Sequence, residues 1–393
     1  MPEGETDQLA PEALPGLRLV LREWGRIGCF GFGGPSTHIS LLRELCVRRH
    51  RWLDAEDFED AFAACNLLPG PASTQLAIYC AWRLRGRSGA LVGGLAFIVP
   101  GLILILALSA LFLVDSPPGW ALGAGAGAGA AVAAVALHAG WSLAIPSWQK
   151  AAQRSRWSAY VVTSGAAAAT IGPWLVLVLL GCGLIELTFQ RSRTTLRTLN
   201  SFGGWPLLAA AATGASGGLL ALAWVAIKVG ALSYGGGFVI VPLMQQDAVN
   251  RYHWLTATQF LNAVALGQIT PGPVVHTVAA VGYAAYGIGG GLVAALIAFS
   301  PSFAFILAGG RHFDELRHSE NARSFLGGAG PAAIGAILGS AIPLARALDE
   351  PWQYAVLAAA ITVLLGLRRG VVLTLLLAGA TGVLIALAGG PLP

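Results

Sequence analysis

Three prolines inside apolar stretches are followed within three residues by polar side chains. These are Ser36 and Thr37 after Pro35, Ser73 and Thr74 after Pro71, and His276 after Pro273. Proline at the first helical position favours a helix start. A helix N-terminus presents free N–H groups and the positive end of the macrodipole. Hydroxyl groups beside them add donors, so the chemistry that these segments suggest is the binding of an anion.

Two basic residues strengthen the case for an anion. Arg26 and Lys228 each lie one or two helical turns before a glycine-rich break in apolar sequence. A cation inside a membrane is costly and is a functional hypothesis by default. Arg22 and Glu23 are close to Arg26, so its side chain can equally well reach the membrane surface. Residues 219–241 contain no charge besides Lys228, which favours a functional role there.

The remaining polar candidates have structural alternatives. Asn66 and Gln268 each stand a few residues before a Pro-Gly-Pro break, where they either cap backbone carbonyls, which we favour, or contact a substrate. His276 could carry a proton, but a lone histidine in a helix is more often a hydrogen-bonded structural residue, and the same holds for His38.

These residues sit on an internal repeat. The segment Gly31-Phe32-Gly33-Gly34-Pro35 and the segment Pro69-Gly70-Pro71 recur 202 residues later, as residues 233–237 and 271–273. Gly237 stands where the first copy has Pro35. Self-similarity at a fixed offset indicates duplication, so we expect two homologous halves. Backbone groups cannot be left unpaired in lipid, so the breaks must line a cavity or be buried in protein.

The composition is that of a polytopic membrane protein. The chain is 55% apolar and only 11% charged, against about 25% charged residues in soluble domains. Its net charge of +5 comes from short loops between apolar runs, where the positive-inside rule explains it, so no nucleic-acid partner is expected. The five cysteines are scattered without a metal-binding spacing, and no cofactor is expected.

The apolar runs give an all-α membrane fold with about thirteen hydrophobic segments. We predict a disordered tail (1–16), a first repeat (17–199), a linking transmembrane helix (200–222) and a second repeat (223–393). The broken runs at 17–41 and 61–82 are separated by a charged segment, 42–60, which we expect to be an interfacial helix. The Gly-Ala tract from Ala121 to Ala134 is expected to allow close helix packing.

Loop charge predicts that the two halves are inserted in opposite directions. Basic residues gather at 83–87 in the first half, whereas the matching link at 284–287 is neutral and the next one, 311–323, is basic. If every run crosses, there are thirteen spans, and Arg43 to Arg51 then lie outside. If the broken runs are re-entrant, dipping in and returning, these arginines lie inside, the inversion is kept and the span count falls. Inverted repeats with broken helices are typical of secondary transporters.

The motifs of the two breaks resemble those of the CHR family of chromate ion transporters, in the long form with two fused domains. The resemblance rests on Phe32 to Pro35, Pro69 to Pro71 and their second-half counterparts, and it covers the chain beyond residue 16. It implies a multi-pass protein of the bacterial cytoplasmic membrane that exports chromate and gives chromate resistance, with sulfate as a competing dianion. Gly237 departs from the family pattern, so which break holds substrate stays open.

We therefore predict a transporter of tetrahedral oxyanions and not an enzyme. Its expected partners are chromate, sulfate, the lipid bilayer and a second copy of the chain in a homodimer. The predicted substrate-binding residues are Arg26, Phe32, Gly33, Gly34, Pro35, Ser36, Thr37, Asn66, Pro69, Gly70, Pro71, Ser73, Thr74, Lys228, Tyr234, Gly235, Gly236, Gln268, Pro271, Gly272, Pro273 and His276.

Other functions fit the sequence less well. A sulfate transporter working by uptake or exchange remains an alternative, because chromate and sulfate are both tetrahedral dianions. A membrane-embedded oxidoreductase would need a haem, flavin or metal signature, which we do not find. A cation transporter would need intramembrane carboxylates, and the apolar cores offer only Glu186, near a span end. We expect no buried carboxylate in the repeat cores that would indicate proton coupling.

Overall fold

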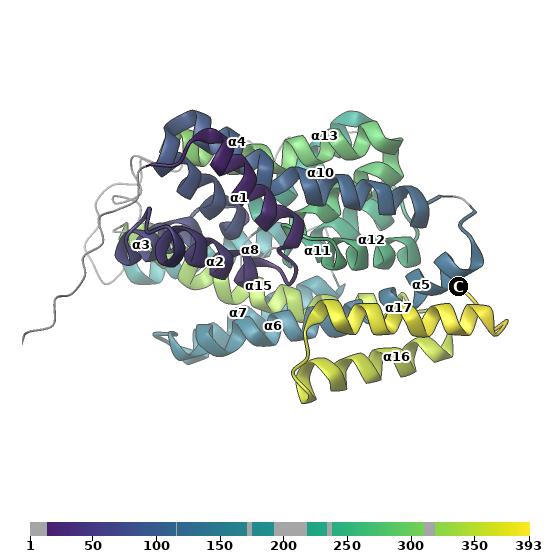
Figure 1. The fold of residues 1–393 in the computed structure, drawn as a ribbon. Helices are drawn as coiled ribbons and strands as arrows, with labels where there is room; N and C mark the ends of the chain where they lie inside the picture. Colours follow the sequence, from purple (N-terminus) through teal and green to yellow (C-terminus); the bar gives the residue numbers. More distant parts are fainter. Residues whose placement is uncertain (1–13, 115, 171–174, 192–217, 234–237, 310–318) are drawn as a thin grey trace, which may run out of the picture.

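Helices make up all the regular structure in the part of the chain that the computed structural model describes, which is residues 14–114, 116–170, 175–191, 218–233, 238–309 and 319–393 (Figure 1). The first half contains α1 (Leu17–Phe30), α2 (Pro35–Arg43), the π-helix η1 (Glu44–Arg49), α3 (Ala55–Leu67), α4 (Ala72–Phe112), α5 (Gly119–Ala130), α6 (Val132–Gln149), α7 (Arg154–Thr170) and α8 (Leu175–Arg191). The second half contains α10 (Leu219–Leu232), α11 (Ile240–Gln245), the π-helix η4 (Gln246–Arg251), α12 (Ala257–Ile269), the 3-10 helix η5 (Val274–His276), α13 (Thr277–Gly309), α15 (Glu320–Arg346), α16 (Pro351–Ile361), the π-helix η7 (Thr362–Gly366) and α17 (Val371–Leu387).

The element bounds repeat at the offset found in the sequence. Helices α1, η1 and α3 begin and end 202 residues before α10, η4 and α12. Even an uncommon backbone conformation recurs, because Arg51 and His253 both have positive φ, at 50° and 51°. Each half therefore folds its first hundred residues along the same path.

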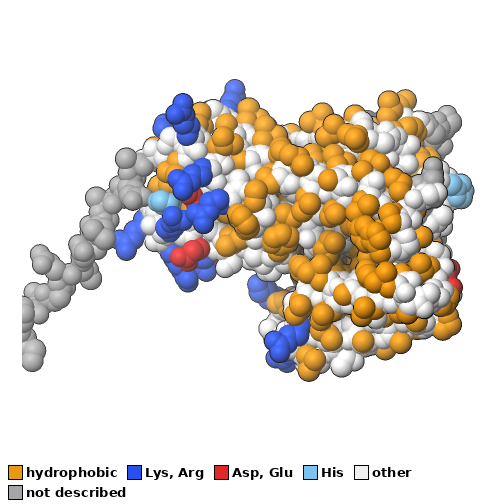
Figure 2. Space-filling model, turned by 45° about the vertical axis from the view of Figure 1, so that its right-hand side comes forward, with side chains coloured by type: hydrophobic (Ala, Val, Ile, Leu, Met, Phe, Trp, Pro, Cys, Tyr) orange, Lys and Arg blue, Asp and Glu red, His pale blue; other side chains and the backbone are white. Residues whose placement is uncertain are grey.

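Each broken run in the first half is a hairpin whose two ends lie together. The Arg49 guanidinium, at the end of η1, lies 3.6 Å from the Glu23 carboxylate of α1. Arg83 pairs at 3.0 Å with Asp57, at the start of α3. Arg85 donates to the carbonyl of Pro15 at 2.6 Å, just before α1. We call this shared end the charged end, and Figure 2 shows most of the basic side chains of that face gathered there.

The charged segment 42–60 is not one interfacial helix, as the sequence suggested. It contains the last residues of α2, the π-helix η1, a turn with Arg51 at positive φ, and the beginning of α3. The chain turns here because it must reverse from one hairpin into the next.

Helices α4 and α13 each reverse direction at one glycine. Gly86 and Gly287 have φ of 59° and 64°, a region that glycine enters at low cost. Beyond the turn, Gly89 packs so closely on Ala81 that a Cβ atom there would lie 2.1 Å from the Ala81 carbonyl oxygen. The residues before each turn complete a hairpin, and those after it form a long apolar helix.

Among the described residues, four helical stretches are long and apolar enough to cross a membrane by length and composition, namely Ala72–Phe112, Gly119–Gln149, Val274–Gly309 and Glu320–Arg346. The described fold is thus all-helical and consistent with the predicted membrane protein. Most of the predicted linking helix lies outside the described residues, and α10 begins at Leu219.

The halves exchange their packing partners. Helix α15 of the second half packs along α7 and α8 of the first, and α17 packs along α5 (Figure 1). Small residues allow these close contacts: a Cβ atom at Gly123 would lie 2.4 Å from the carbonyl oxygen of Gly382, and one at Gly339 would lie 2.1 Å from that of Gly165. The packing role predicted for the Gly-Ala tract is confirmed.

Candidate anion site at the helix breaks

The breaks of the two halves meet inside the molecule. The backbone N–H of Gly272 donates to the carbonyl of Gly31 at 3.2 Å. This bond joins the second Pro-Gly-Pro to the end of α1. Gly101 of α4 faces the same place, since a Cβ atom there would lie 2.2 Å from the carbonyl oxygen of Pro271 and 2.7 Å from the His276 ring.

The first Pro-Gly-Pro meets the second half in the same way. Gly70 has φ of +122°, and a Cβ atom there would lie 3.3 Å from the carbonyl oxygen of Gly230 and 3.5 Å from the Ser302 hydroxyl. Both Pro-Gly-Pro breaks therefore touch helices of the other half. We call this meeting point the crossing.

Polar side chains around the crossing are buried without partners. Within the described part of the chain, several buried atoms in or beside the breaks make no hydrogen bond, among them His38 Nδ1, Thr74 Oγ1, Gln75 Oε1, Ser233 Oγ, Gln268 Nε2 and Ser302 Oγ. Buried polar groups in proteins are nearly always hydrogen-bonded to protein, water or ligand. The three hydroxyls and Gln268 Nε2 can therefore donate hydrogen bonds to a solute, whereas Gln75 Oε1 can only accept.

Two histidines flank the crossing in similar surroundings. Nε2 of His38 lies 2.8 Å from the carbonyl oxygen of Gly31, as expected for a hydrogen-bonded structural residue. His276 is fully buried and lies near the backbone of Ile98, but neither ring nitrogen makes a hydrogen bond of normal geometry among the described residues. The rings pack edge-on against Phe97 and Phe299, with centroids 5.0 and 5.2 Å apart.

The glycine break of the first half is open, whereas the Pro-Gly-Pro break of the second half is sealed. Ser36 is exposed and Phe32 is 41% exposed, but residues 270–276 are all buried. The second-half counterpart of the open break, residues 234–237, lies outside the described residues. A groove of about 300 Å³ runs from Ser36 along α2 to Arg43 and Arg48 at the charged end. Helix α2 begins at Pro35 with no side-chain cap on its N-terminal N–H groups, which remain available to an anion.

The predicted cations lie away from the crossing. The Arg26 side chain is 56% exposed and lies 3.7 Å from the Glu23 carboxylate at the charged end. The Lys228 ammonium is bound to the Asp247 carboxylate and lies 5.8 Å from the centre of the Trp224 ring. Lys228 thus ties α10 to η4, whereas Arg26 pairs within its own helix, and Lys228 is not the isolated charge that the sequence suggested.

The expectation of no buried carboxylate in the repeat cores was wrong. Glu23 and Asp247 are 5% and 4% exposed, and Glu186 is 6% exposed. Each carboxylate is stabilised in its buried position by a basic partner. Glu23 pairs with Arg26 and Arg49, Asp247 with Lys228, and Glu186 with Arg156.

The other predicted residues divide between the crossing and its surroundings. Asn66 donates to the Phe62 carbonyl at 2.9 Å, which is the capping role that we favoured. Brought to the crossing or its edge are Pro69, Gly70, Pro71, Ser73, Thr74, Gln268, Pro271, Gly272, Pro273 and His276. The open break contains Phe32, Gly33, Gly34, Pro35, Ser36 and Thr37. Tyr234, Gly235 and Gly236 lie outside the described residues.

Two residues at the crossing were not predicted. Gly101 and Ser302 come from α4 and α13, away from the break motifs in sequence. Gly101 follows Pro100 and Ser302 follows Pro301, and these prolines occupy the same repeat position. That match was a signal that could have pointed to them.

Comparison with known proteins places the chain. The sequence pattern described as Chromate transporter matches residues 19–187 and 220–383, which is one match in each half. The chain belongs to the chromate transporter family. Within this family, it is 31% identical to a chromate transport protein of Cupriavidus metallidurans over 84% of this chain and 83% of that protein.

More distant members of the chromate transporter family also match over most of their length. A probable chromate transport protein of Synechococcus elongatus is 29% identical, over 84% of this chain and 85% of that one. An uncharacterized transporter of Methanocaldococcus jannaschii is 26% identical, over 96% and 97%. No solved structure matches the chain. The recognition made from the break motifs is confirmed.

Proposed function

We propose that this chromate transporter family member exports chromate across the bacterial cytoplasmic membrane. The observation that carries the proposal is the crossing, where breaks from both halves meet among buried polar atoms without partners. Names of relatives support chromate as the substrate. Sulfate is a competing substrate, because hydroxyl and amide donors recognise any tetrahedral dianion.

The proposed site takes its donors from the crossing and the open break. The free N–H groups at the start of α2, the hydroxyls of Ser36, Thr37 and Thr74, and Ser302 from the second half would surround the anion. The groove along α2 gives access from the charged end. Rocking of the two halves would close that path and open the sealed break on the other side.

We propose that the halves are inverted and that the hairpins are re-entrant. The two hairpins of the first half return to the charged end, which supports this variant over thirteen crossings. The later part of α4, the α5–α6 pair, α7 and α8 then cross in the first half. The later part of α13, α15, α16 and α17 cross in the second. Together with the linking transmembrane helix predicted from the sequence, this makes nine crossings in total and puts the charged end in the cytoplasm.

Membrane potential suffices to drive export in this orientation. Moving one elementary charge is worth ~2.3 kcal/mol per 100 mV, so a dianion leaving a negative interior gains ~4.6 kcal/mol. At ~1.4 kcal/mol per decade, this sustains a gradient on the order of a thousandfold. The direction and the voltage are tested by counterflow of chromate, sulfate and molybdate in proteoliposomes at set potentials and pH.

Labelling of matched cysteines tests the inversion. Arg87 and Ile288 directly follow the reversal glycines of α4 and α13. In a Cys29→Ser background, which removes the exposed native thiol, we expect a membrane-impermeant maleimide to label Arg87→Cys only in inverted vesicles. Ile288→Cys should be labelled only in intact cells. Labelling of both variants from the same side would contradict the inversion.

Ser302 gives the sharpest test of the site. Its buried hydroxyl has no partner, so Ser302→Ala should leave thermal stability unchanged or raise it slightly. A hydrogen bond to a charged group is worth roughly 1.5–3 kcal/mol, so the half-saturating chromate concentration should rise at least about tenfold.

Ser300 on the same helix is the matched control for Ser302. It is exposed, and its hydroxyl donates to the Ile297 carbonyl at 2.7 Å. Ser300→Ala should change neither chromate affinity nor flux. Equal effects of the two substitutions, or none from Ser302→Ala, would remove the crossing as the binding site.

A further inference from the structure

A second polar cavity lies apart from the crossing, at the charged end. It has a volume of about 600 Å³ and lies between the ends of α6 and α8 and the beginnings of α7 and α15. Its charged lining residues are Lys150, Arg156, Glu186, Glu320 and Arg323. We call it the charged-end cavity. The transport site proposed above makes no use of it.

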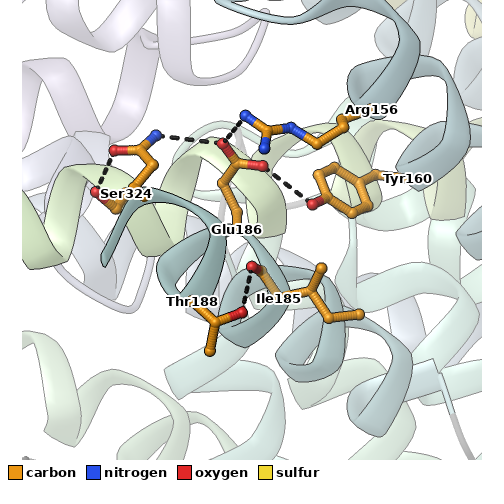
Figure 3. Close-up of polar contacts among 7 residues, drawn as sticks. Arg156, Tyr160, Ile185, Glu186, Thr188 and Ser324 are labelled. Carbon is orange, nitrogen blue, oxygen red and sulfur yellow. Dashed lines mark hydrogen bonds and ion pairs between the residues drawn. The ribbon is translucent and has the colours of Figure 1, made fainter. Parts of the chain in front are cut away.

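Both oxygens of the Glu186 carboxylate in this cavity accept hydrogen bonds (Figure 3). Glu186 accepts hydrogen bonds from Arg156 at 3.0 Å, from the Tyr160 hydroxyl at 3.0 Å and from Gln190 at 3.2 Å. Ser324 of α15 donates to the Gln190 side chain at 2.6 Å. The network neutralises Glu186 and fixes the Arg156 side chain in place.

The basic side chains of the cavity still have charges or hydrogen-bond donors without a partner among the described residues. The buried Nε of Arg156 makes no hydrogen bond among the described residues, although a guanidinium group has five N–H donors. Lys150 and Arg323 are exposed at the rim, and neither has an ion pair in the part of the chain that the structure describes. Among the described lining residues, three cations thus face two carboxylates, Glu186 and Glu320, which leaves one positive charge in excess.

The duplication does not account for this network. Helices α16 and α17 follow α15 as α7 and α8 follow the α5–α6 pair, but neither α16 nor α17 contains a charged residue. The fold can therefore be built without Arg156 and Glu186. Because this pair is buried at one end of the molecule and has no counterpart in α16 or α17, it indicates a function on that side of the membrane.

One wall of the cavity also packs toward the second half. Tyr160, which lines the cavity, belongs to the same apolar cluster as Val239 and Leu243 at the beginning of α11. Helix α11 is the first described helix after residues 234–237. The apolar cluster thus joins one wall of the cavity to the beginning of α11.

We propose that the charged-end cavity is an access site that concentrates a tetrahedral oxyanion before it reaches the crossing. Arg156 binds the anion through its unused donor, and Lys150 and Arg323 attract it from the rim. The inference rests on the proposed transport of oxyanions. The phosphate of an anionic lipid headgroup, which carries a net negative charge that zwitterionic phosphatidylcholine lacks, has the same chemistry, so the test must separate the two sources.

The test compares two arginines on one helix. Arg323 begins α15 at the cavity, whereas the exposed Arg346 ends α15 far from it. In proteoliposomes of phosphatidylcholine at low salt, Arg323→Gln and Lys150→Gln should each raise the half-saturating chromate concentration about threefold to fivefold, with the maximal rate unchanged. Arg346→Gln should have no effect. At 1 M salt, where the Debye length is about 3 Å, the difference should vanish.

Arg156 is tested without leaving a buried charge alone. Arg156→Gln combined with Glu186→Gln removes both members of the pair, and elution as a single symmetric peak on size exclusion shows that the variant is folded. We expect about a tenfold rise in the half-saturating concentration for this double variant. Unchanged affinity in all three variants would overturn the access site while wild-type transport stands.

The lipid arm decides between the two sources of anion. If the substitutions change transport only in liposomes that contain anionic lipid, the cavity holds a headgroup and the oxyanion assignment is wrong. Equal effects in both kinds of liposome support the oxyanion. Failure of the wild-type protein to carry any oxyanion would count against the proposed function itself.

Discussion

Replacing Lys228 with alanine is expected to destabilise the protein by about 3–5 kcal/mol, because it leaves the Asp247 carboxylate buried without its partner. Asp247 has only 5% of its side chain exposed, and Lys228 only 15%. Thermal unfolding of the purified protein in detergent, followed by size exclusion, measures the loss. A variant as stable as the wild type would show that the ion pair does not hold α10 to η4.

The double substitution separates structure from substrate binding. Lys228→Ala with Asp247→Ala should recover most of the lost stability, since no charge is then left unpaired. Arg26→Ala is the matched control from the same repeat position, and with its side chain 56% exposed it should cost less than about 1 kcal/mol. If the double variant carries chromate with unchanged affinity, Lys228 serves only to hold α10 to η4 and is not a substrate ligand.

Gly230→Ala is the second substitution with a large expected effect. A Cβ atom at this position would lie 2.1 Å from the carbonyl oxygen of Ala298, where α10 packs on α13. Backbone on both sides cannot move aside as a flexible side chain can, so the added methyl should cost at least 1–3 kcal/mol, the range for overpacked cores. A fall in melting temperature and in the yield of monodisperse protein would show it.

Gly25 provides the control for Gly230. It also lies inside a helix, but no atom would come within 4 Å of its Cβ. Gly25→Ala should therefore stabilise α1 by up to about 1 kcal/mol, through helix propensity alone. Similar melting temperatures for the two variants would mean that α10 and α13 are not as closely packed as described.

The sequence was most informative about local structure. Because the two halves share an offset of 202, the breaks at Gly33 and Gly70 and the helices around them could be located twice. Each glycine that stands at positive φ in the first-half breaks, Gly33, Gly34 and Gly70, belongs to a motif singled out beforehand. The positions of the breaks could be predicted from neighbouring residues alone, because glycine and proline interrupt a helix whatever that helix packs against.

Contacts between distant segments were not readable from the sequence. Lys228 and Asp247 are 19 residues apart, and only the reversal of the chain after the break brings them together. Glu23 and Arg49 meet for the same reason. An apolar run broken in the middle has the same composition whether it crosses the membrane or turns back, so hydropathy could not distinguish a hairpin from a span. The role of the predicted binding residues stays a prediction.

The exchange of packing partners has an evolutionary consequence. Since α15 lies on α7 and α8 while α17 lies on α5, a polypeptide with a single copy would leave the glycine-lined sides of these helices facing lipid. Such an ancestor could complete its structure only by associating with a second copy of itself. The fused gene product would then preserve, in one chain, a pair that once assembled from two.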